Sequence, residues 1–184
     1  TGDDNVAIGY EAAPSMTSGD ANIAIGYRAG KAWTTCSNNI AIGKEADYTS
    51  DGASYNIMIG YQAGKLNDQD RSTAIGWQSY SQATDGYANT CLGYQAGHSI
   101  TTGDECVCIG SEAGKDQVAT GSHELWIASN NQGAGNADVW IHGNSSAACY
   151  QGNNSSSWST TSDRRLKKNI VDNTKGLAEI NQLR

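Results

Sequence analysis

The stretch Asn22-Ile-Ala-Ile-Gly-Tyr-Arg-Ala-Gly30 recurs in close copies through residue 114 of the chain. Its central glycine returns at Gly9, Gly26, Gly43, Gly60, Gly76, Gly93 and Gly110. Successive glycines are 17, 17, 17, 16, 17 and 17 residues apart. A fixed period of this length is typical of repeat proteins in which each unit packs only on its neighbours. The pattern predicts an all-β fold, a parallel β-solenoid shaft of about seven 17-residue coils.

In each copy we expect the three residues before the glycine to form a short strand, whose side chains alternate between two faces. The first and third positions are mostly large and β-branched, as in Ile23 and Ile25, and we expect them to fill the interior of the coil. The middle positions would then point outward, and they are Ala7, Ala24, Ala41, Met58, Ala74, Cys91 and Cys108. A row of small residues on an outward face predicts that another backbone approaches there, so we interpret it as a subunit interface.

Composition supports a thin, self-associating solenoid. The 184 residues include no Phe, one Pro and 22 Gly, and only 38% are hydrophobic, so little apolar area is available to bury in one chain. Residues 1–162 carry 6 basic and 16 acidic side chains, a net charge of −10, which argues against a nucleic-acid partner. The five cysteines are odd in number and scattered, and we expect free thiols, no metal and no cofactor. Because the sequence begins at Thr1, we expect it to be a fragment.

Three further rows follow the period. The glycine suits a sharp turn or a positive φ. The asparagines that begin the units (Asn5, Asn22, Asn39, Asn56 and Asn89) can stack into a hydrogen-bonded ladder. An aromatic row follows the glycine at Tyr10, Tyr27, Tyr61, Trp77 and Tyr94. Such a row can bind sugars or cover grooves between chains, and we favour the structural role.

After Gly114 the period breaks. Leu125-Trp-Ile127 and Val139-Trp-Ile141 predict two strands of a different β unit. We divide the chain into a shaft (1–121), a β tip (122–162) and a basic segment (163–184) whose apolar residues at 177, 180 and 183 predict the start of a helix. The tip gathers Trp126, Trp140, Tyr150 and Trp158, which are candidates for receptor binding, with packing among subunits as the alternative.

The repeated units resemble the head repeats of trimeric autotransporter adhesins and of phage tail fibres. The resemblance covers residues 1–114 and implies left-handed parallel β-rolls, three of which pack about a threefold axis. Under this reading the subunit interface is that of a homotrimer.

Ser162-Asp-Arg-Arg-Leu-Lys-Lys-Asn-Ile170 resembles the opening of the intramolecular chaperone domain, peptidase family S74, at the C-terminus of phage tail fibres and tailspikes. The resemblance implies a domain that trimerises the chain and then cuts itself off. Ser162 would be the nucleophile, Lys167 the base, and Asp163 would flank the cut. A Ser–Lys pair works when burial lowers the lysine pKa. We expect cleavage in a full-length parent and no enzyme activity in this fragment.

Together these features predict the structural and receptor-binding part of a viral tail fibre, acting on the virion at the host surface. Its partners would be its own copies, other tail or fibre proteins, and a host receptor, a glycan or another component of the outer envelope. The alternatives are the head of a bacterial trimeric adhesin and a polysaccharide-binding or polysaccharide-degrading tailspike. An ice-binding solenoid would need a threonine row in register, which the sequence lacks.

Overall fold

The computed structural model describes residues 2–115, 120–129, 139–146 and 149–151, and these ranges contain ten short β-strands and no helix. The strands are β1 (Val6–Ile8), β2 (Ile23–Ile25), β3 (Ile40–Ile42), β4 (Ile57–Ile59), β5 (Thr73–Ile75), β6 (Thr90–Leu92), β7 (Val107–Ile109), β8 (Leu125–Ala128), β9 (Val139–Gly143) and β10 (Cys149–Gln151). The predicted helix start in 163–184 lies outside the described residues.

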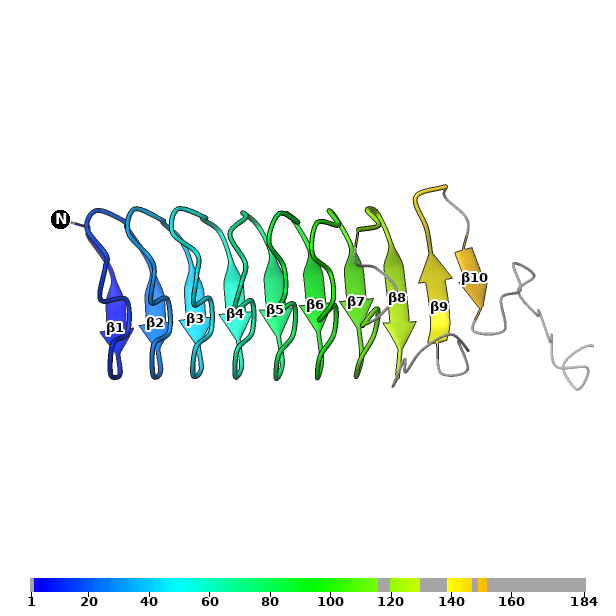
Figure 1. Cartoon of the computed structure of the whole chain (residues 1–184), viewed down its shortest axis with the longest axis horizontal. Coiled ribbons are helices and arrows are strands. Elements are labelled where there is room, and N and C mark those ends of the chain that lie inside the picture. The colour runs from blue at the N-terminus through cyan, green and yellow to red at the C-terminus, as the bar shows by residue number, and fades with distance from the viewer. Residues whose placement is uncertain (1, 116–119, 130–138, 147–148, 152–184) are drawn as a thin grey trace, which may run out of the picture.

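All ten strands form one sheet in sequence order (Figure 1). Strands β1 to β8 are parallel, and each residue pairs with the residue at the same position of the next coil, as Ile23 does with Ile40. The predicted parallel solenoid with a spacing of about 17 residues is therefore confirmed. Strands β8, β9 and β10 then pair antiparallel. The two strands predicted beyond Gly114 are present, but they continue the sheet of the coils rather than form a different β unit.

The glycine after each strand lets successive coils lie in direct backbone contact. Gly43 has a φ of 130°, a region that side chains rarely adopt. A Cβ added there would lie 2.4 Å from the carbonyl oxygen of Gly60 in the next coil. The other glycines of this row have φ values between 117° and 141°, and an added Cβ would meet the next coil in the same way. The row therefore needs glycine for both its φ and its lack of a side chain.

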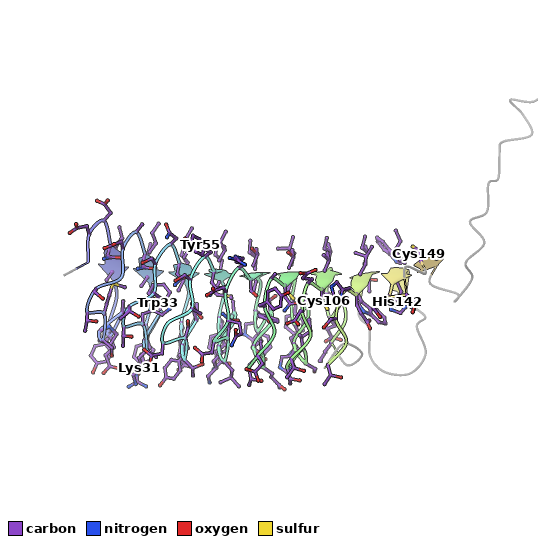
Figure 2. All side chains as sticks on the ribbon, turned by 90° about the horizontal axis from the view of Figure 1, so that it is seen from above. Lys31, Trp33, Tyr55, Cys106, His142 and Cys149 are labelled. Atoms are coloured by element: carbon purple, nitrogen blue, oxygen red, sulfur yellow. The ribbon has the colours of Figure 1, made fainter. Side chains whose placement is uncertain are left out.

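The side chains of the strands face the opposite way from the prediction. The middle positions of β2 to β7 are the buried ones, with Ala24 at 1% and Ala41 at 0% exposure. The flanking rows are half-buried or exposed and stand on the outer face of the sheet (Figure 2). The prediction that Ala24, Ala41, Met58, Ala74, Cys91 and Cys108 form a subunit contact is therefore wrong, since these side chains lie inside their own chain. Ala7 is exposed because no described coil covers β1.

The narrow interior of the coil explains this orientation. The middle strand residues share the core with a second buried row, Ala29, Ala46, Ala63, Ala96 and Ala113, which leaves no room for two isoleucines per coil. Larger side chains fit only where their neighbour shrinks. Trp33 is buried beside Gly30, whose added Cβ would lie 2.5 Å from the indole ring. At the two equivalent positions of another coil the sizes are exchanged, since Tyr80 is large and Ala83 is small. Such paired changes keep the interior filled at constant volume.

The predicted asparagine ladder is confirmed, and it bonds mainly to the backbone. The N–H of Asn39 donates to Oδ1 of Asn22 (3.0 Å), and the N–H of Asn56 donates to Oδ1 of Asn39 (2.8 Å). The side-chain amides of Asn22 and Asn39 donate to the carbonyls of Cys36 and Ala53. Each buried amide thus satisfies backbone groups that lie outside the short strands.

A second ladder, which the sequence analysis missed, runs along the loops. The N–H of Asp20 donates to Oγ of Ser37, that of Ser37 to Oγ of Ser54, and that of Ser54 to Oδ1 of Asp70. Asp or Ser stands six residues before every glycine of the row except Gly93, and this was a readable signal, because both side chains are short acceptors.

The coil between Gly60 and Gly76 is one residue shorter, and it disturbs the asparagine ladder. In this coil the loop carbonyl that would accept from the side-chain amide of Asn56 is that of Gln69. It accepts from Nδ2 of Asn67 instead (3.0 Å). Nδ2 of Asn56 is consequently left without a partner. A deletion of one residue in a loop therefore changes a buried hydrogen bond inside the coil.

We predict that Gly43→Ala lowers the free energy of unfolding by more than about 2 kcal/mol, because the alanine meets both an unfavourable φ and the backbone of the next coil. The matched control is Gly52→Ala in the following loop, where an added Cβ meets nothing within 4 Å. The control should change stability by less than about 1 kcal/mol. Urea unfolding followed by circular dichroism measures both, and equal effects would contradict the role assigned to the glycine row.

Candidate functional surfaces

The outer face of the sheet is an extended apolar surface. It consists of the first and third residues of each strand, which are Ile, Val, Leu or Thr in every coil. At its ends Ile8 is 58% and Ile109 is 38% exposed, and Ile75 within it is 40% exposed. We call these two rows of β1 to β7 the isoleucine face. Contiguous apolar surface of this kind on a soluble chain marks an interaction site.

The sequence predicted that these residues lie inside, because large apolar side chains are usually buried. The length of the coil could have corrected this prediction. A coil of 17 residues whose asparagine, alanine and loop rows all point inward has no space left for a pair of isoleucines. The preference of β-branched residues for strands holds on either face of the sheet.

Of the four candidate receptor residues of the tip, the structure describes the side chains of Trp126 and Trp140, and these two lie in different environments. Trp126 in β8 is only 3% exposed, stacks on His142 with ring centroids 3.9 Å apart, and donates from Nε1 to Glu124 (2.9 Å). It closes the end of the core. Its indole is therefore not available to a receptor at the surface of this chain.

Trp140 in β9 has the opposite environment. The pairing of β8 with β9 shifts here, since Ile127 pairs with Ile141 and Ala128 with Val139. Trp140 falls at this bulge and is 66% exposed. The backbone of Tyr150 lies in β10 opposite His142, and Trp158 lies outside the described residues. Of the four candidates, Trp140 is the one whose side chain is seen at the surface.

The cleavage residues Ser162, Asp163 and Lys167 also lie outside the described residues. The predicted self-cleavage therefore remains a hypothesis carried by the sequence motif.

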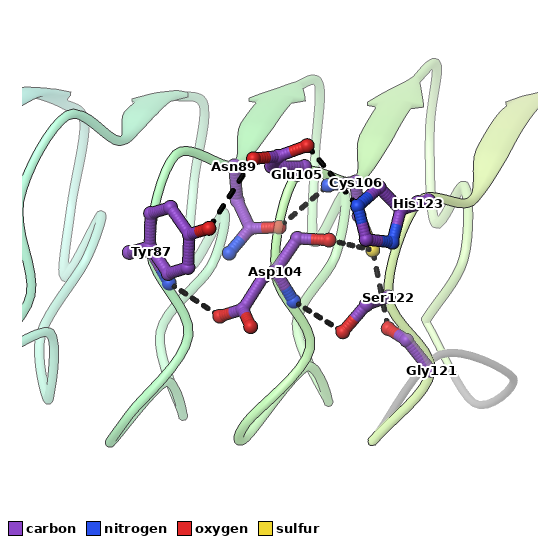
Figure 3. A network of polar contacts seen from close by, with 8 residues as sticks. All are labelled: Tyr87, Asn89, Asp104, Glu105, Cys106, Gly121, Ser122 and His123. Atoms are coloured by element: carbon purple, nitrogen blue, oxygen red, sulfur yellow. Dashed lines mark hydrogen bonds and ion pairs between the residues drawn. The ribbon is translucent and has the colours of Figure 1, made fainter. Parts of the chain in front are cut away.

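A polar network joins the last coils of the shaft to the start of the tip (Figure 3). Glu105 accepts from the hydroxyl of Tyr87 (3.2 Å) and lies 3.2 Å from Nε2 of His123. The charge of Glu105 raises the pKa of Tyr87. The His123 and Glu105 side chains are 61% and 48% exposed, so solvent screens the contact and it adds little stability. We interpret the trio as a cross-coil link rather than as a catalytic group.

The five cysteines are free thiols, as expected, and four of them are buried. Burial raises the pKa of Cys36 and of Cys106 to about 11. Cys91 faces Cys108 in the neighbouring strand, and a hydrogen bond that the Cys91 thiol donates to Cys108, together with burial, raises the pKa of Cys91. Thiols held in this protonated form are poor nucleophiles and poor metal ligands. In the described part of the chain, no three His, Cys, Asp or Glu side chains gather as a metal site.

One buried carboxyl group stands out in the core. Asp47 is fully buried, and its Oδ2 accepts from Nε1 of Trp33 (3.0 Å). Its Oδ1 has no partner, and neither do Oγ of Ser50 and Oδ1 of Asn67. These oxygens belong to coils that stack directly on one another, and two of the three can only accept. A proton on Asp47 would add a donor to this corner beside the hydroxyl of Ser50.

The environment of Asp47 favours that protonated form. Burial raises its pKa to about 7, against the hydrogen bonds of Trp33 and Asn67, which act to lower it. An aspartate in the unfolded chain has a pKa of 3.8, so between these two values the folded protein binds the extra proton. Stability is therefore greatest below the unfolded value and falls as the pH rises toward about 7.

No family model matches the chain, and neither the curated proteins nor the solved structures contain a match. Within the described residues there is no helix that is long and apolar enough to cross a membrane.

We predict that Asp47→Asn removes this part of the pH dependence. The free energy of unfolding of wild type should be greater at pH 4 than at pH 7, by up to about 4 kcal/mol. The Asp47→Asn variant should lack this difference. Asp85→Asn, at an exposed aspartate, is the matched control and should follow wild type. Thermal unfolding across this pH range measures the effect, and identical profiles for wild type and Asp47→Asn would refute it.

Proposed function

We propose that this chain is the structural and host-adhesive part of a viral tail fibre, and that three copies associate through the isoleucine face. A self-cleaving C-terminal chaperone in the full-length parent would assemble the trimer. The fibre would act on the virion at the host surface, beside other tail or fibre proteins.

The observation that carries the proposal is the exposed isoleucine face. In one chain the interior holds mainly small side chains, with a large one such as Trp33 where its neighbour is small, while the isoleucines of the strands stand on the outer face. Burial of apolar area contributes roughly 25 cal/mol per Å², and each coil repeats the same contribution. Association through this face would therefore supply the burial that a thin solenoid lacks by itself.

The face also has the geometry that a lengthwise interface needs. Strand pairing without any shift between β1 and β7 keeps its two rows straight along the solenoid. Copies related by a rotation axis parallel to the solenoid could thus meet along the whole shaft, in a closed assembly. The number three comes from the resemblance of the repeats to adhesin heads and tail fibres.

The motif Ser162–Ile170 favours a tail fibre over a bacterial adhesin head, because it resembles the chaperone that phage fibres carry. The sequence continues into this motif after the strands of the tip. An enzymatic tailspike would need a wider coil with a carboxylate pair in a groove, and a 17-residue coil whose interior is already filled leaves little room for one.

We predict that Ile42→Lys abolishes association and preserves the solenoid fold, because the charge would be buried without a partner only in the assembly. Ala41→Arg should instead unfold the chain, since that side chain points into a filled core. Light scattering with circular dichroism separates the two outcomes. Thr35→Lys, at an exposed loop residue, is the control and should remain trimeric. A folded monomeric wild type at micromolar concentration would end the proposal.

We predict that a full-length parent chain cuts itself at the Ser162–Asp163 bond or at the bond before Ser162. The Ser162 hydroxyl would attack a backbone carbonyl and Lys167 would take its proton, once trimerisation holds the two groups together. Gel analysis of the parent beside Ser162→Ala and Lys167→Ala versions is the test. Both variants should stay whole. Equal cleavage in all three proteins would refute the assignment. Loss of cleavage in the Ser162→Ala variant alone would refute the role given to Lys167.

A further inference from the structure

The basic side chains of the acidic shaft are not spread evenly. Residues 1–162 contain six of them, and four lie on the three successive coils that carry Gly26, Gly43 and Gly60. These four are Arg28, Lys31, Lys44 and Lys65. Mutual repulsion opposes such a cluster in a structure where equivalent positions are stacked directly on one another.

The structure shows how the cluster is accommodated. One row follows the glycines and reads Tyr27, Lys44, Tyr61, and a second row four residues further on reads Lys31, Tyr48, Lys65. Tyrosine and lysine alternate in both rows and in opposite phase. We call these six residues the Tyr–Lys patch.

Each lysine of the patch lies near a tyrosine ring of a neighbouring coil. Nζ of Lys44 is 5.6 Å from the ring centre of Tyr27 and 5.7 Å from that of Tyr61. Tyr48 has Nζ of Lys31 at 5.2 Å and that of Lys65 at 5.9 Å, and Lys31 also donates to its hydroxyl (3.2 Å). These distances are within the range of cation–π attraction.

Around the patch, basic side chains outnumber the carboxylates that pair with them. Glu11 pairs with Arg28 (2.7 Å) and lies 3.9 Å from Lys31, and Glu45 pairs with Lys65 (3.4 Å). Lys44 is exposed, and among the described residues no carboxylate lies within ion-pairing distance of it. The four cations therefore face two carboxylates, and Lys44 is the one that a ligand anion can reach without displacing a partner.

The patch lies away from the isoleucine face. In Figure 2 the strands and their outer side chains occupy one side of the solenoid, and Lys31 stands on the opposite side. Association through the isoleucine face would thus leave the patch open to solvent.

We propose that the Tyr–Lys patch binds an acidic glycan, a chain of sugars that carry carboxylates at intervals and that lies along the solenoid axis. The hydroxyls of the tyrosines would hydrogen-bond to sugar hydroxyls, and Lys44 would pair with a carboxylate. The inference deepens the proposed host-adhesive function by naming a ligand class and a place on the shaft, and the binding itself requires no particular oligomeric state.

The charge of the shaft decides between acidic polymers. With a net charge of −10 over residues 1–162, the solenoid repels a ligand that carries a negative charge at every unit, such as a nucleic acid. A glycan with spaced carboxylates meets the local cations of the patch and offers neutral hydroxyl groups to the tyrosine hydroxyls. Local attraction and these hydrogen bonds can then outweigh the general repulsion.

Calorimetric titration of the full chain with hyaluronan oligosaccharides, in which every second sugar carries a carboxylate, and with the same oligosaccharides after reduction of their carboxyl groups to neutral alcohols, tests the inference. Wild type should bind the acidic oligomers with an affinity that falls as salt rises, and should not bind the neutral ones. Lys44→Gln should weaken binding about tenfold, because a hydrogen bond to a charged group is lost. Lys115→Gln is the matched control, at the position of Lys31 and Lys65 in a coil outside the patch, and should stay within about twofold.

The results that overturn the inference are specific. They are failure of wild type to bind the acidic oligomers, equal binding of neutral ones, or equal loss in Lys44→Gln and Lys115→Gln. Loss in Trp140→Ala with full binding by Lys44→Gln would move the site to the tip. Light scattering on the same samples keeps the two proposals apart, since a monomer that binds would refute only the trimer and a trimer that does not bind would refute only the patch.

Discussion

Direct backbone contact between successive coils is the constraint on which the rest of this structure depends. At the glycine row no Cβ fits between one coil and the next, as the 2.4 Å approach computed for Gly43 shows. The contact holds strands about 4.8 Å apart and fixes their register. Once the register is fixed, every position of the unit stacks on itself, and a choice of residue at one position becomes a row along the whole shaft.

Stacking turns single interactions into ladders, and it also brings like charges together. Stacking lets the buried asparagines form hydrogen bonds between coils, because Asn22 and Asn39 each offer an acceptor to the next coil and a donor to a loop carbonyl. In the cationic part of the shaft the stacking of like charges is avoided. Lys44 lies between two tyrosines, and Glu11 pairs with Arg28, so that these charges meet a ring or an opposite charge in the adjacent coil.

The same constraint limits the width of the coil and so decides which side chains stay outside. Small residues such as Ala41 occupy the core, and the compensation of Trp33 by Gly30 shows how little free volume remains. The aliphatic residues of each strand consequently stand on the outer face. A fold that leaves its best apolar surface uncovered is suited to association, and this is the physical basis for proposing a shared shaft of several chains.

The sequence by itself determined the repeat, the strands, the glycine turns and the asparagine ladder, because each rests on local geometry that recurs every 17 residues. It also contained the alternation of Tyr48 with Lys31 and Lys65, although only aligned coils bring these residues together. Period-two alternation separates Ala41 from Ile40 and Ile42 but does not say which face is inward. Only the tertiary structure decided that, since the inward face depends on how the remaining residues of the coil close around it. The isolation of Trp126 from Trp140 was decided in the same way, by a bulge between β8 and β9 that no local pattern announces.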